Sequence, residues 1–403
     1  MTRERMPKGF TAWVAATVGA DLGSGVLAFA LTWVASGHGP NAAAAVLTLT
    51  VAPTALFGLL GGAVADRYGV RRVMIACTLA LMLISTGLAL VVTVWPGTPI
   101  TLLVAAAAIG TVAAFHRPAI GVFPRLFVAG AGLGTAMARV GVASQIAGTI
   151  APPLGGLLIG LVALSGVAWI DVLGCAIMVV VLLCIRPPLT PAAAPDAVTA
   201  RGIIDGLRTA RRTPGIPTLL LCVGLIAGAV LPAVILGIPL AARERGWSAA
   251  EAGLIEAGWI AGGLVTGLWF SWRGIAVRMW RPMTAGAVVV ALGLGGLASA
   301  PLWMPAAAST CVVGAGVVMF TAHAFPTYLL LAPARMLSRF QSLLVLVQRA
   351  PQLVIAPLVG AGVAATSTGP MLAFAGVLAL FAAFIVASDA TLRSFTSATS
   401  GSA

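Results

Sequence analysis

The sequence has few charged residues and almost no lysine. Asp, Glu, Lys and Arg make up 8% of the 403 residues, hydrophobic residues make up 60%, and Lys8 is the single lysine. Soluble globular proteins carry about 25% charged residues, so this composition excludes that class. Lys8 lies outside any Gly-x-x-x-x-Gly-Lys-Ser/Thr pattern, which excludes a self-contained ATP-binding loop. We therefore expect no use of ATP and no cofactor.

Recognisable metal, disulfide and catalytic motifs are also missing. All five cysteines lie inside apolar stretches, and no two are spaced as Cys-x-x-Cys. We interpret them as small buried hydrophobic residues, with neither a disulfide framework nor a metal site. The sequence lacks His-Glu-x-x-His and Gly-x-Ser-x-Gly motifs, so we do not expect an enzyme. The cysteines are Cys77, Cys175, Cys184, Cys222 and Cys311.

What the chain has instead is a series of long apolar segments. A helix needs about 20 apolar residues to cross a bilayer, and twelve segments meet that length or come close to it. We therefore predict an all-α integral membrane protein with twelve transmembrane helices. The first segment is too long for a signal-peptide core, so we keep it as a retained helix. The segments lie at 10–35, 43–65, 73–95, 99–122, 140–164, 167–186, 216–241, 249–272, 283–301, 306–331, 340–366 and 370–390.

The positive charge is concentrated in alternate loops. A net charge of +13 on a polar surface would suggest nucleic acid as a partner. Here the distribution indicates topology, because cytoplasmic loops of membrane proteins are enriched in arginine and lysine. Only Arg243 and Arg245 depart from the alternation. We expect a multi-pass protein of the bacterial inner (plasma) membrane with both termini in the cytoplasm. The positive segments are the N-terminus (Arg3, Arg5, Lys8), 66–72, 123–139, 187–214, 273–282, 333–339 and the tail.

A Pro/Ala-rich stretch divides the chain into two halves. We predict an N-terminal six-helix bundle over 1–186, a cytoplasmic linker over 187–214, a C-terminal six-helix bundle over 215–391 and a cytoplasmic tail over 392–403. Within the linker, residues 201–212 can form a basic amphipathic helix on the membrane surface.

The two halves also repeat weakly. Ala151-Pro152-x-x-Gly155 recurs as Ala356-Pro357-x-x-Gly360, and Gly62-x-x-x-Asp66 has a counterpart in Gly267-x-x-x-Ser271 at the same offset. Two pairs at one offset favour pseudo-symmetric bundles related by an axis along the membrane normal. Chance similarity between Ala/Gly-rich helices is the alternative.

The loop after the second apolar segment carries the most specific motif. It reads Gly62-x-x-x-Asp66-Arg67-x-Gly69-x-Arg71-Arg72. Gly62 allows close approach of a neighbouring helix, and Gly69 allows a tight reversal. The pattern resembles the signature loop between helices 2 and 3 of the major facilitator superfamily of transporters, which implies the major facilitator fold. An ordinary positive loop is the alternative.

The resemblance implies a gate in this loop. In the family, the matching residues latch the two halves together on the cytoplasmic side while the cavity opens outward. We assign Gly62, Asp66, Arg67, Gly69, Arg71 and Arg72 to this gate. Arg335, Arg339 or the amides at the start of the eleventh segment are the expected partners of Asp66.

A second motif lies in the fifth apolar segment, where Gly148-x-x-Ala151-Pro152-Pro153-Leu154-Gly155-Gly156 is similar to the glycine/proline motif of proton-coupled antiporters in this superfamily. Ala151 stands where that motif has glycine, and the upstream glycine is displaced by one place. Proline frees a carbonyl and glycine removes bulk, so this helix can kink and pack closely. A generic small-residue interface is the alternative. Softer matches around Pro124, Leu207 and Trp247 resemble bacterial drug and siderophore exporters.

Charged residues inside the apolar segments are candidates for proton coupling, because charges at membrane depth are costly and usually functional. Asp21 and Glu256 can exchange protons in a low-dielectric cavity, and Glu256 can alternatively meet a cationic substrate. Arg349 can be their counter-ion or contact an anionic substrate. A carboxylate hydrogen-bonded to a neighbouring helix is the alternative for Asp21. Cavity candidates are Gln145, Gln348, Gln352 and His323, although we prefer packing or a gate role for His323, His116 and Arg117.

Two further acids have local explanations. Ser248-x-x-Glu251 is typical of a capping box at a helix start, and Asp171 lies where it can favour a helix N-terminus.

These features predict a secondary active transporter that works by alternating access. We expect a monomeric, proton-coupled exporter of small amphipathic compounds, such as a drug, an antibiotic, a siderophore or another secondary metabolite. Its expected partners are its small-molecule substrate, protons and the lipid bilayer, without nucleic acid. The alternative is a proton-coupled symporter that takes up a small metabolite. A membrane-embedded enzyme and a non-transporting receptor are the other classes.

Overall fold

A computed structural model describes residues 6–95, 97–128, 132–189, 207–274, 276–333 and 336–394, leaving aside the side chains at 59, 337–339 and 342. Within these ranges every regular element is a helix. The chain divides into two compact units, residues 1–197 with 248–253 and residues 198–247 with 254–403. The predicted domain boundaries stay predictions, because much of the segment 187–214 lies outside the described residues. Of the expected basic helix over 201–212, residues 207–212 are helical.

Eleven helices of the described part are long and apolar enough to cross a membrane. One of them, α5 (Gly132–Cys184), has 53 residues and is interrupted at Ala163, where φ is 55°. At 1.5 Å per residue it would reach about 80 Å, whereas the hydrocarbon core of a bilayer is about 30 Å thick. Its two arms are therefore separate crossings. The prediction of an all-α membrane protein with twelve transmembrane helices is confirmed.

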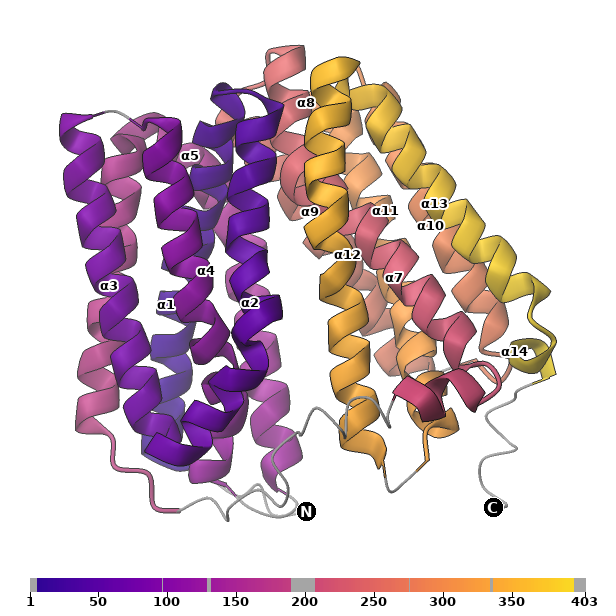
Figure 1. Cartoon of the computed structure of the whole chain (residues 1–403), viewed down its shortest axis with the longest axis horizontal. Coiled ribbons are helices and arrows are strands. Elements are labelled where there is room, and N and C mark those ends of the chain that lie inside the picture. Colours follow the sequence, from indigo (N-terminus) through magenta and orange to yellow (C-terminus); the bar gives the residue numbers. More distant parts are fainter. Residues whose placement is uncertain are drawn as a thin grey trace. The chain divides into compact units, whose positions relative to one another are not determined.

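The first unit is a bundle of long helices (Figure 1). Helix α1 packs on α5, α2 packs on α4, and α3 packs on both α4 and α5. Small residues allow these contacts: a Cβ added to Gly110 on α4 would lie 2.5 Å from the Thr50 carbonyl oxygen on α2. The elements are α1 (Lys8–Gly37), α2 (Pro40–Tyr68), α3 (Val70–Val94), α4 (Pro99–Val122), the short η1 (Phe123–Leu126) and α5.

An aromatic cluster closes one end of the first unit. Trp13 lies 4.8 Å from Phe123 between ring centroids, and Phe10 lies 6.0 Å from Phe127. All four rings are buried. Because the cluster joins the start of α1 to η1, it anchors this end of the bundle by apolar burial and ring packing.

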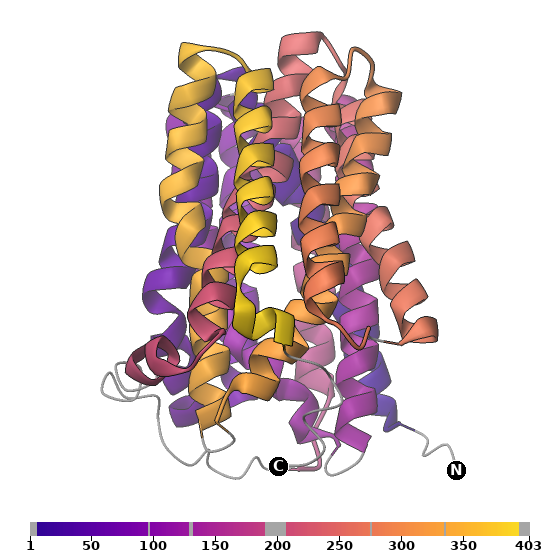
Figure 2. The same ribbon diagram turned by 90° about the vertical axis from the view of Figure 1, so that its right-hand side faces the viewer.

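The second unit is also a helical bundle, and Figure 2 shows the short α14 lying across the end of α13. Helix α10 packs on α11 and α13, and α7 packs on α12 and α13. The segment η2 is a π-helix that continues α7 into α8. The elements are α7 (Ile216–Pro232), η2 (Ala233–Gly237), α8 (Ile238–Arg245), α9 (Ala249–Arg273), α10 (Trp280–Ser299), α11 (Trp303–Leu331), α12 (Leu337–Ala365), α13 (Thr368–Ser388) and α14 (Ala390–Ser394).

Charged side chains at the helix ends stabilise exposed backbone groups. The backbone N–H of Ser248 donates to the Glu251 carboxylate over 2.7 Å, and Glu251 N–H donates to Ser248 Oγ over 3.2 Å. The predicted capping box is confirmed. The guanidinium of Arg245 donates to the carbonyls of Leu297 and Ala298, over 3.0 and 2.6 Å, where α10 ends. Arg245, which departs from the charge alternation, therefore has a structural task at a helix C-terminus.

Candidate functional site

Asp21 lies near the middle of α1 and is half-buried. Its carboxyl accepts a hydrogen bond from Ser144 Oγ on the first arm of α5, over 2.8 Å. Arg117 on α4 interacts electrostatically with the same carboxyl. The hydrogen bond joins α1 to the first arm of α5, and the charge of Arg117 on α4 acts on the same carboxyl without a hydrogen bond. Arg117, for which sequence reasoning preferred packing or a gate, is the cation that acts on Asp21 within this unit.

Asp171 forms a second polar centre in the same unit. Its carboxylate accepts hydrogen bonds from Ser24 on α1, over 2.9 Å, and from Ser85 on α3, over 2.6 Å. The residue is 2% exposed. It lies about two turns inside the second arm of α5, so it does not act at a helix N-terminus, the role that its sequence position favoured. Sequence reasoning missed this site because its three members lie far apart in the chain.

Thr78 and His116 form a weaker polar contact in the same unit. Thr78 Oγ1 lies 3.5 Å from His116 Nε2, at the limit of a hydrogen bond, and Thr78 also donates to the Met74 carbonyl over 2.8 Å. His116 is half-buried between α3 and α4. This arrangement fits the packing role preferred for His116.

The gate loop connects α2 to α3 through Gly69 alone. Gly69 has φ of 89°, a conformation that side chains with a Cβ disfavour, so glycine is required for this reversal. Asp66, Arg67 and Arg72 are exposed, and Arg67 lies 5.5 Å from the centroid of the Tyr68 ring. Within the described ranges Asp66 makes no hydrogen bond or ion pair. Its predicted partner Arg335 and the side chain of Arg339 lie outside the described residues.

Arg71 on α3 and Gly61 on α2 have contacts that the sequence did not predict. Arg71 donates to the carbonyls of Leu182 and Leu183, over 3.0 and 3.1 Å, and so caps the end of α5. A Cβ added to Gly62 would meet nothing within 4 Å, whereas one added to Gly61 would clash with the carbonyl of Ala114 on α4. Close approach of a neighbouring helix was expected at Gly62. In the first unit this close approach occurs at Gly61, one residue earlier in the chain.

The glycine/proline motif of α5 packs against α1. A Cβ on Gly25 would lie 2.6 Å from the Cβ of Ala151, and one on Gly155 would lie 3.1 Å from the ring of Phe29. Pro152 and Pro153 lie inside the helix. The expected close packing is therefore confirmed, while an antiporter role for Gly148, Ala151, Pro152, Gly155 and Gly156 stays a prediction.

In the second unit Glu256 is the acid at membrane depth. It lies about two turns into α9 and is half-buried. Among the described residues it has no hydrogen bond or ion pair. Helix α9 packs closely on α11, because a Cβ on Gly258 would lie 2.7 Å from the Ala307 carbonyl oxygen. Gly258 and Gly262 of α9 therefore lie against α11.

The polar residues of α12 and α11 differ in how many of their polar groups already have a partner. Gln352 is 2% exposed, and its amide donates to the Gln348 carbonyl over 2.8 Å. Arg349 is half-buried and engaged in an interaction. His323 is fully buried, with Nδ1 2.9 Å from the Met319 carbonyl oxygen and Nε2 accepting from Ala276 N–H over 3.3 Å. This geometry fits packing for His323 better than a cavity position.

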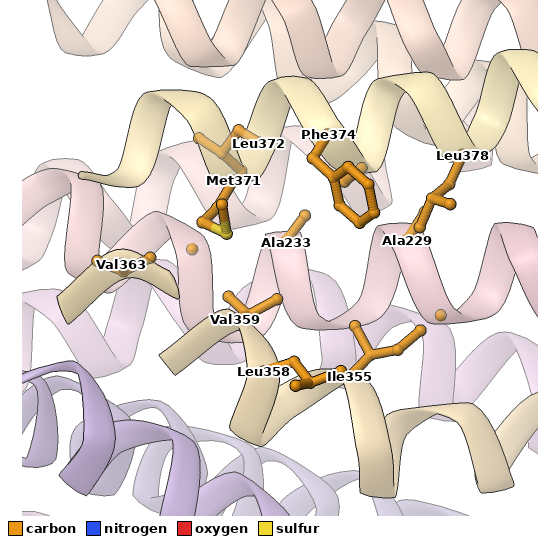
Figure 3. A pocket seen from close by; sticks show the side chains of 13 residues that line it. Ala229, Ala233, Ile355, Leu358, Val359, Val363, Met371, Leu372, Phe374 and Leu378 are labelled. Atoms are coloured by element: carbon orange, nitrogen blue, oxygen red, sulfur yellow. The ribbon is translucent and has the colours of Figure 1, made fainter. Parts of the chain in front are cut away.

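An apolar cavity of about 100 Å³ lies between α7, α12 and α13 (Figure 3). Ile355, Met371 and Phe374 are among the side chains that line it, and all of its lining residues are apolar. The cavity borders the π-helix η2 through Ala233. It offers apolar contacts only and holds no group that could bind a charge or a metal ion.

The comparisons with known proteins agree with the architecture. The model of the Major Facilitator Superfamily matches residues 13–354, most of the chain. The protein belongs to this superfamily. No curated protein matches the sequence of this transporter. The family and the fold are those of membrane transporters rather than enzymes, and the predicted major facilitator fold is confirmed.

Several solved structures have the same fold as this transporter. A POT family transporter in complex with a thioalcohol-conjugated peptide is 13% identical, with a TM-score of 0.75 over 96% of this chain and 97% of its own. A nucleoside transporter is 14% identical, with a TM-score of 0.73 over 94% and 100%. A bacterial homolog of the human lysosomal transporter Spinster, inward-facing and unoccupied, is 14% identical, with a TM-score of 0.68 over 96% and 97%.

The polar centres of the first unit can carry out proton chemistry. Asp21 is half-buried and faces a hydroxyl and a cation, so it can bind and release a proton with a change in its interactions. Across the described residues no three His, Cys, Asp or Glu side chains converge in a way that could hold a metal ion.

Proposed function

We propose that this transporter exports small amphipathic compounds in exchange for protons, and that Asp21 couples the two movements. The observation that carries the proposal is the contact set of Asp21, a carboxyl near the middle of a membrane-spanning helix with Ser144 as hydrogen-bond donor and Arg117 as nearby cation. A charge at this depth is costly unless it is compensated.

Proton binding changes what holds α1, α4 and α5 together. The ionised carboxyl of Asp21 attracts Arg117, and a proton on that carboxyl removes the attraction while the hydrogen bond with Ser144 can remain. The two proton states thus differ in interaction energy within the bundle. Such a difference is what a ligand needs in order to shift a conformational equilibrium. In this mechanism the proton gradient supplies the energy for export.

The exposed loop between α2 and α3 supports a gate in the same mechanism. Asp66, Arg67 and Arg72 are exposed, and among the described residues Asp66 makes no hydrogen bond or ion pair, while Arg67 lies over the Tyr68 ring. We assign them to a latch that closes on the cytoplasmic side, with Gly69 keeping the turn tight. Arg71 contributes by holding the end of α5.

Uptake by proton symport is the second candidate. Ala151 replaces the first glycine of the antiporter-like motif, and the structures with the same fold include transporters of peptides and nucleosides. In a symporter the proton and the substrate move in the same direction, whereas in the exporter they move in opposite directions. The direction of transport therefore separates the two candidates.

Everted bacterial membrane vesicles that contain the protein test the proposal directly. An inward-acidic proton gradient should drive ethidium into these vesicles, a protonophore should abolish the accumulation, and Asp21→Asn should lose it. Asp389→Asn is the matched control, because Asp389 caps α14 through the N–H groups of Thr391 and Leu392. Gradient-driven accumulation in right-side-out vesicles instead would favour symport, and indifference to the protonophore would contradict proton coupling.

Location and orientation need a separate measurement. We propose that the protein lies as a monomer in a bacterial inner membrane. The alternating arginines support an orientation with both termini in the cytoplasm. Reporter fusions at each terminus, one active only in the cytoplasm and one only outside it, check the orientation.

A further inference from the structure

We propose that Asp171 is a second proton-binding carboxyl of this transporter, reached through the hydroxyl of Ser24. The proposal extends the proton coupling proposed above and rests on it for its role in transport. The site itself, a buried carboxyl between two serine hydroxyls, is a property of the first unit alone.

The surroundings of Asp171 are tightly packed. A Cβ on Gly23 of α1 would lie 3.2 Å from the Asp171 Cα, and one on Gly174 would lie 3.1 Å from the Gly19 carbonyl oxygen. The backbones of α1 and α5 therefore touch on this side of the carboxyl. With 2% of the residue exposed, there is little room for water to solvate a charge. A carboxylate in such a place is expensive to keep ionised.

The groups that face Asp171 do not compensate a negative charge. Ser24 and Ser85 are neutral donors, and in the described part of the chain no arginine or lysine pairs with this carboxyl. Cys175 on the same arm interacts with it electrostatically, but a thiol brings no positive charge. The charged and titratable residues on α1, α3 and α5 are Lys8, Asp21, Arg71, Arg72, Cys77, Arg139, Asp171, Cys175 and Cys184.

A proton bound to Asp171 removes the uncompensated negative charge without disturbing the packing of the helices. When the carboxyl gains a proton, one O–H bond forms and the group changes from a charge of −1 to neutral. The protonated oxygen can then donate to one serine, while the other oxygen still accepts from the second serine. Ser85 is 1% exposed and holds its carboxyl oxygen from α3, so it positions the group in both states.

Ser24 provides the route by which a proton reaches Asp171. It lies three residues after Asp21 on α1, so the two side chains share one helix face. Ser24 is exposed while Asp171 is buried, and the two are joined by a hydrogen bond of 2.9 Å. A hydronium ion on the Asp21 side gives one proton to the Ser24 oxygen and becomes water, while the O–H proton of Ser24 passes to Asp171. One proton moves inward and the serine is left unchanged.

Infrared spectroscopy of the full chain in liposomes tests this site without substrate and without a gradient. Protonated carboxyl groups give C=O bands that disappear on ionisation. We expect Asp171→Asn to remove one band that is present in the wild-type protein at neutral pH, and Asp21→Asn to leave that band in place. Ser85→Ala should shift the same band because one hydrogen bond is lost. Glu251→Gln, at the capping box, is the control that should leave it unchanged.

The proton route through Ser24 is tested by a separate measurement. In heavy water the Asp171 band shifts as its proton is replaced by deuterium, and Ser24→Ala should slow that exchange by about 100-fold, the lower end of what a positioned proton-transfer group contributes. Because Ser24→Ala and Ser85→Ala keep the carboxyl, they test the site even if Asp171→Asn does not fold. A carboxyl spectrum identical in wild type and Asp171→Asn, or unaffected by Ser85→Ala, would overturn the proposal. Failure of the export proposal would show instead as wild-type vesicles that do not accumulate ethidium.

Discussion

The two units treat their membrane-depth acids differently. In the first unit Asp21 and Asp171 are each tied to hydroxyl donors on other helices, and Asp21 also interacts with Arg117. In the second unit Glu256 has no such partner among the described residues, whereas Glu244 and Asp389 accept hydrogen bonds from backbone N–H groups at helix starts. Thr368 at the start of α13 donates its backbone N–H to Glu244 over 2.9 Å.

This contrast suggests a division of labour. Acids that are tied across several helices can transmit a change in protonation to the packing of the bundle, because each hydrogen bond joins two helices. An acid without a protein partner is suited to meet a ligand. We therefore propose that proton coupling belongs to the first unit and that Glu256 contacts a cationic substrate. The following experiments test this contrast between the two units.

The largest effect is expected at Asp21. Asp21→Asn keeps the shape of the side chain but removes the titratable group, so proton-driven dye export should fall by about 100-fold or more. Initial rates of ethidium accumulation in everted vesicles, normalised to protein in the membrane, measure this. An equal loss with Ser144→Ala would show that the hydrogen bond rather than the proton is what matters.

Substitution of Glu256 should act on substrate choice instead. With Glu256→Gln we expect the apparent affinity for a cationic dye to fall about tenfold, equal to about 1.4 kcal/mol, and transport of a neutral dye to persist. The comparison of ethidium with a neutral amphipathic dye in the same vesicles decides this. Loss of both activities would place Glu256 with the coupling groups and remove the division of labour.

The third prediction concerns the charge of Asp66 in the gate loop. Asp66→Asn should reduce transport by ~5- to 150-fold, the range of a typical coupling free energy between sites, while protein levels in the membrane stay normal. Undiminished export by this variant would remove Asp66 from the gate.

Glycine spacing in α2 predicts a difference in stability. Gly61→Ala should lower the unfolding free energy by about 1–3 kcal/mol, because the added methyl group clashes with the Ala114 carbonyl. Gly62→Ala meets nothing in this unit and should leave the unfolding temperature unchanged. Thermal unfolding of the detergent-solubilised protein compares the two variants. A larger loss at Gly62 would mean that its close contact lies outside the first unit.

The smallest effect is expected at the arginines of the loop. Arg71→Gln removes the cap on α5 and should cost about 0.3–1 kcal/mol of stability, whereas Arg67→Gln, at an exposed position over Tyr68, should cost less. The same unfolding assay ranks them. Equal stability of the two variants would argue against Arg71 as a helix cap.

Much of the fold follows from local properties of the chain. The crossings were predictable because a bilayer demands a run of apolar residues of a fixed length, and the break at Ala163 falls close to the predicted gap between two segments. The Ser248–Glu251 capping box was predictable because both residues belong to one helical turn. Asp21 was predictable as a candidate because a charge stands out in an apolar segment.

The remaining features of the candidate site depend on how helices rotate and pack. Gly61 and Gly62 are neighbours in the chain, so their positions differ by about 100° of rotation around the helix axis. Composition alone does not indicate which of the two glycines faces α4. Arg71 reaches carbonyls that lie more than a hundred residues further along the chain. No local pattern indicates such a pair.

By itself the sequence of this transporter determined its membrane nature, its twelve crossings and its family, because hydrophobicity, charge in loops and short motifs are local quantities. Only the tertiary structure decided which polar groups meet. Asp171, Ser24 and Ser85 are distant in the chain and come together because α1 and α3 both pack on α5.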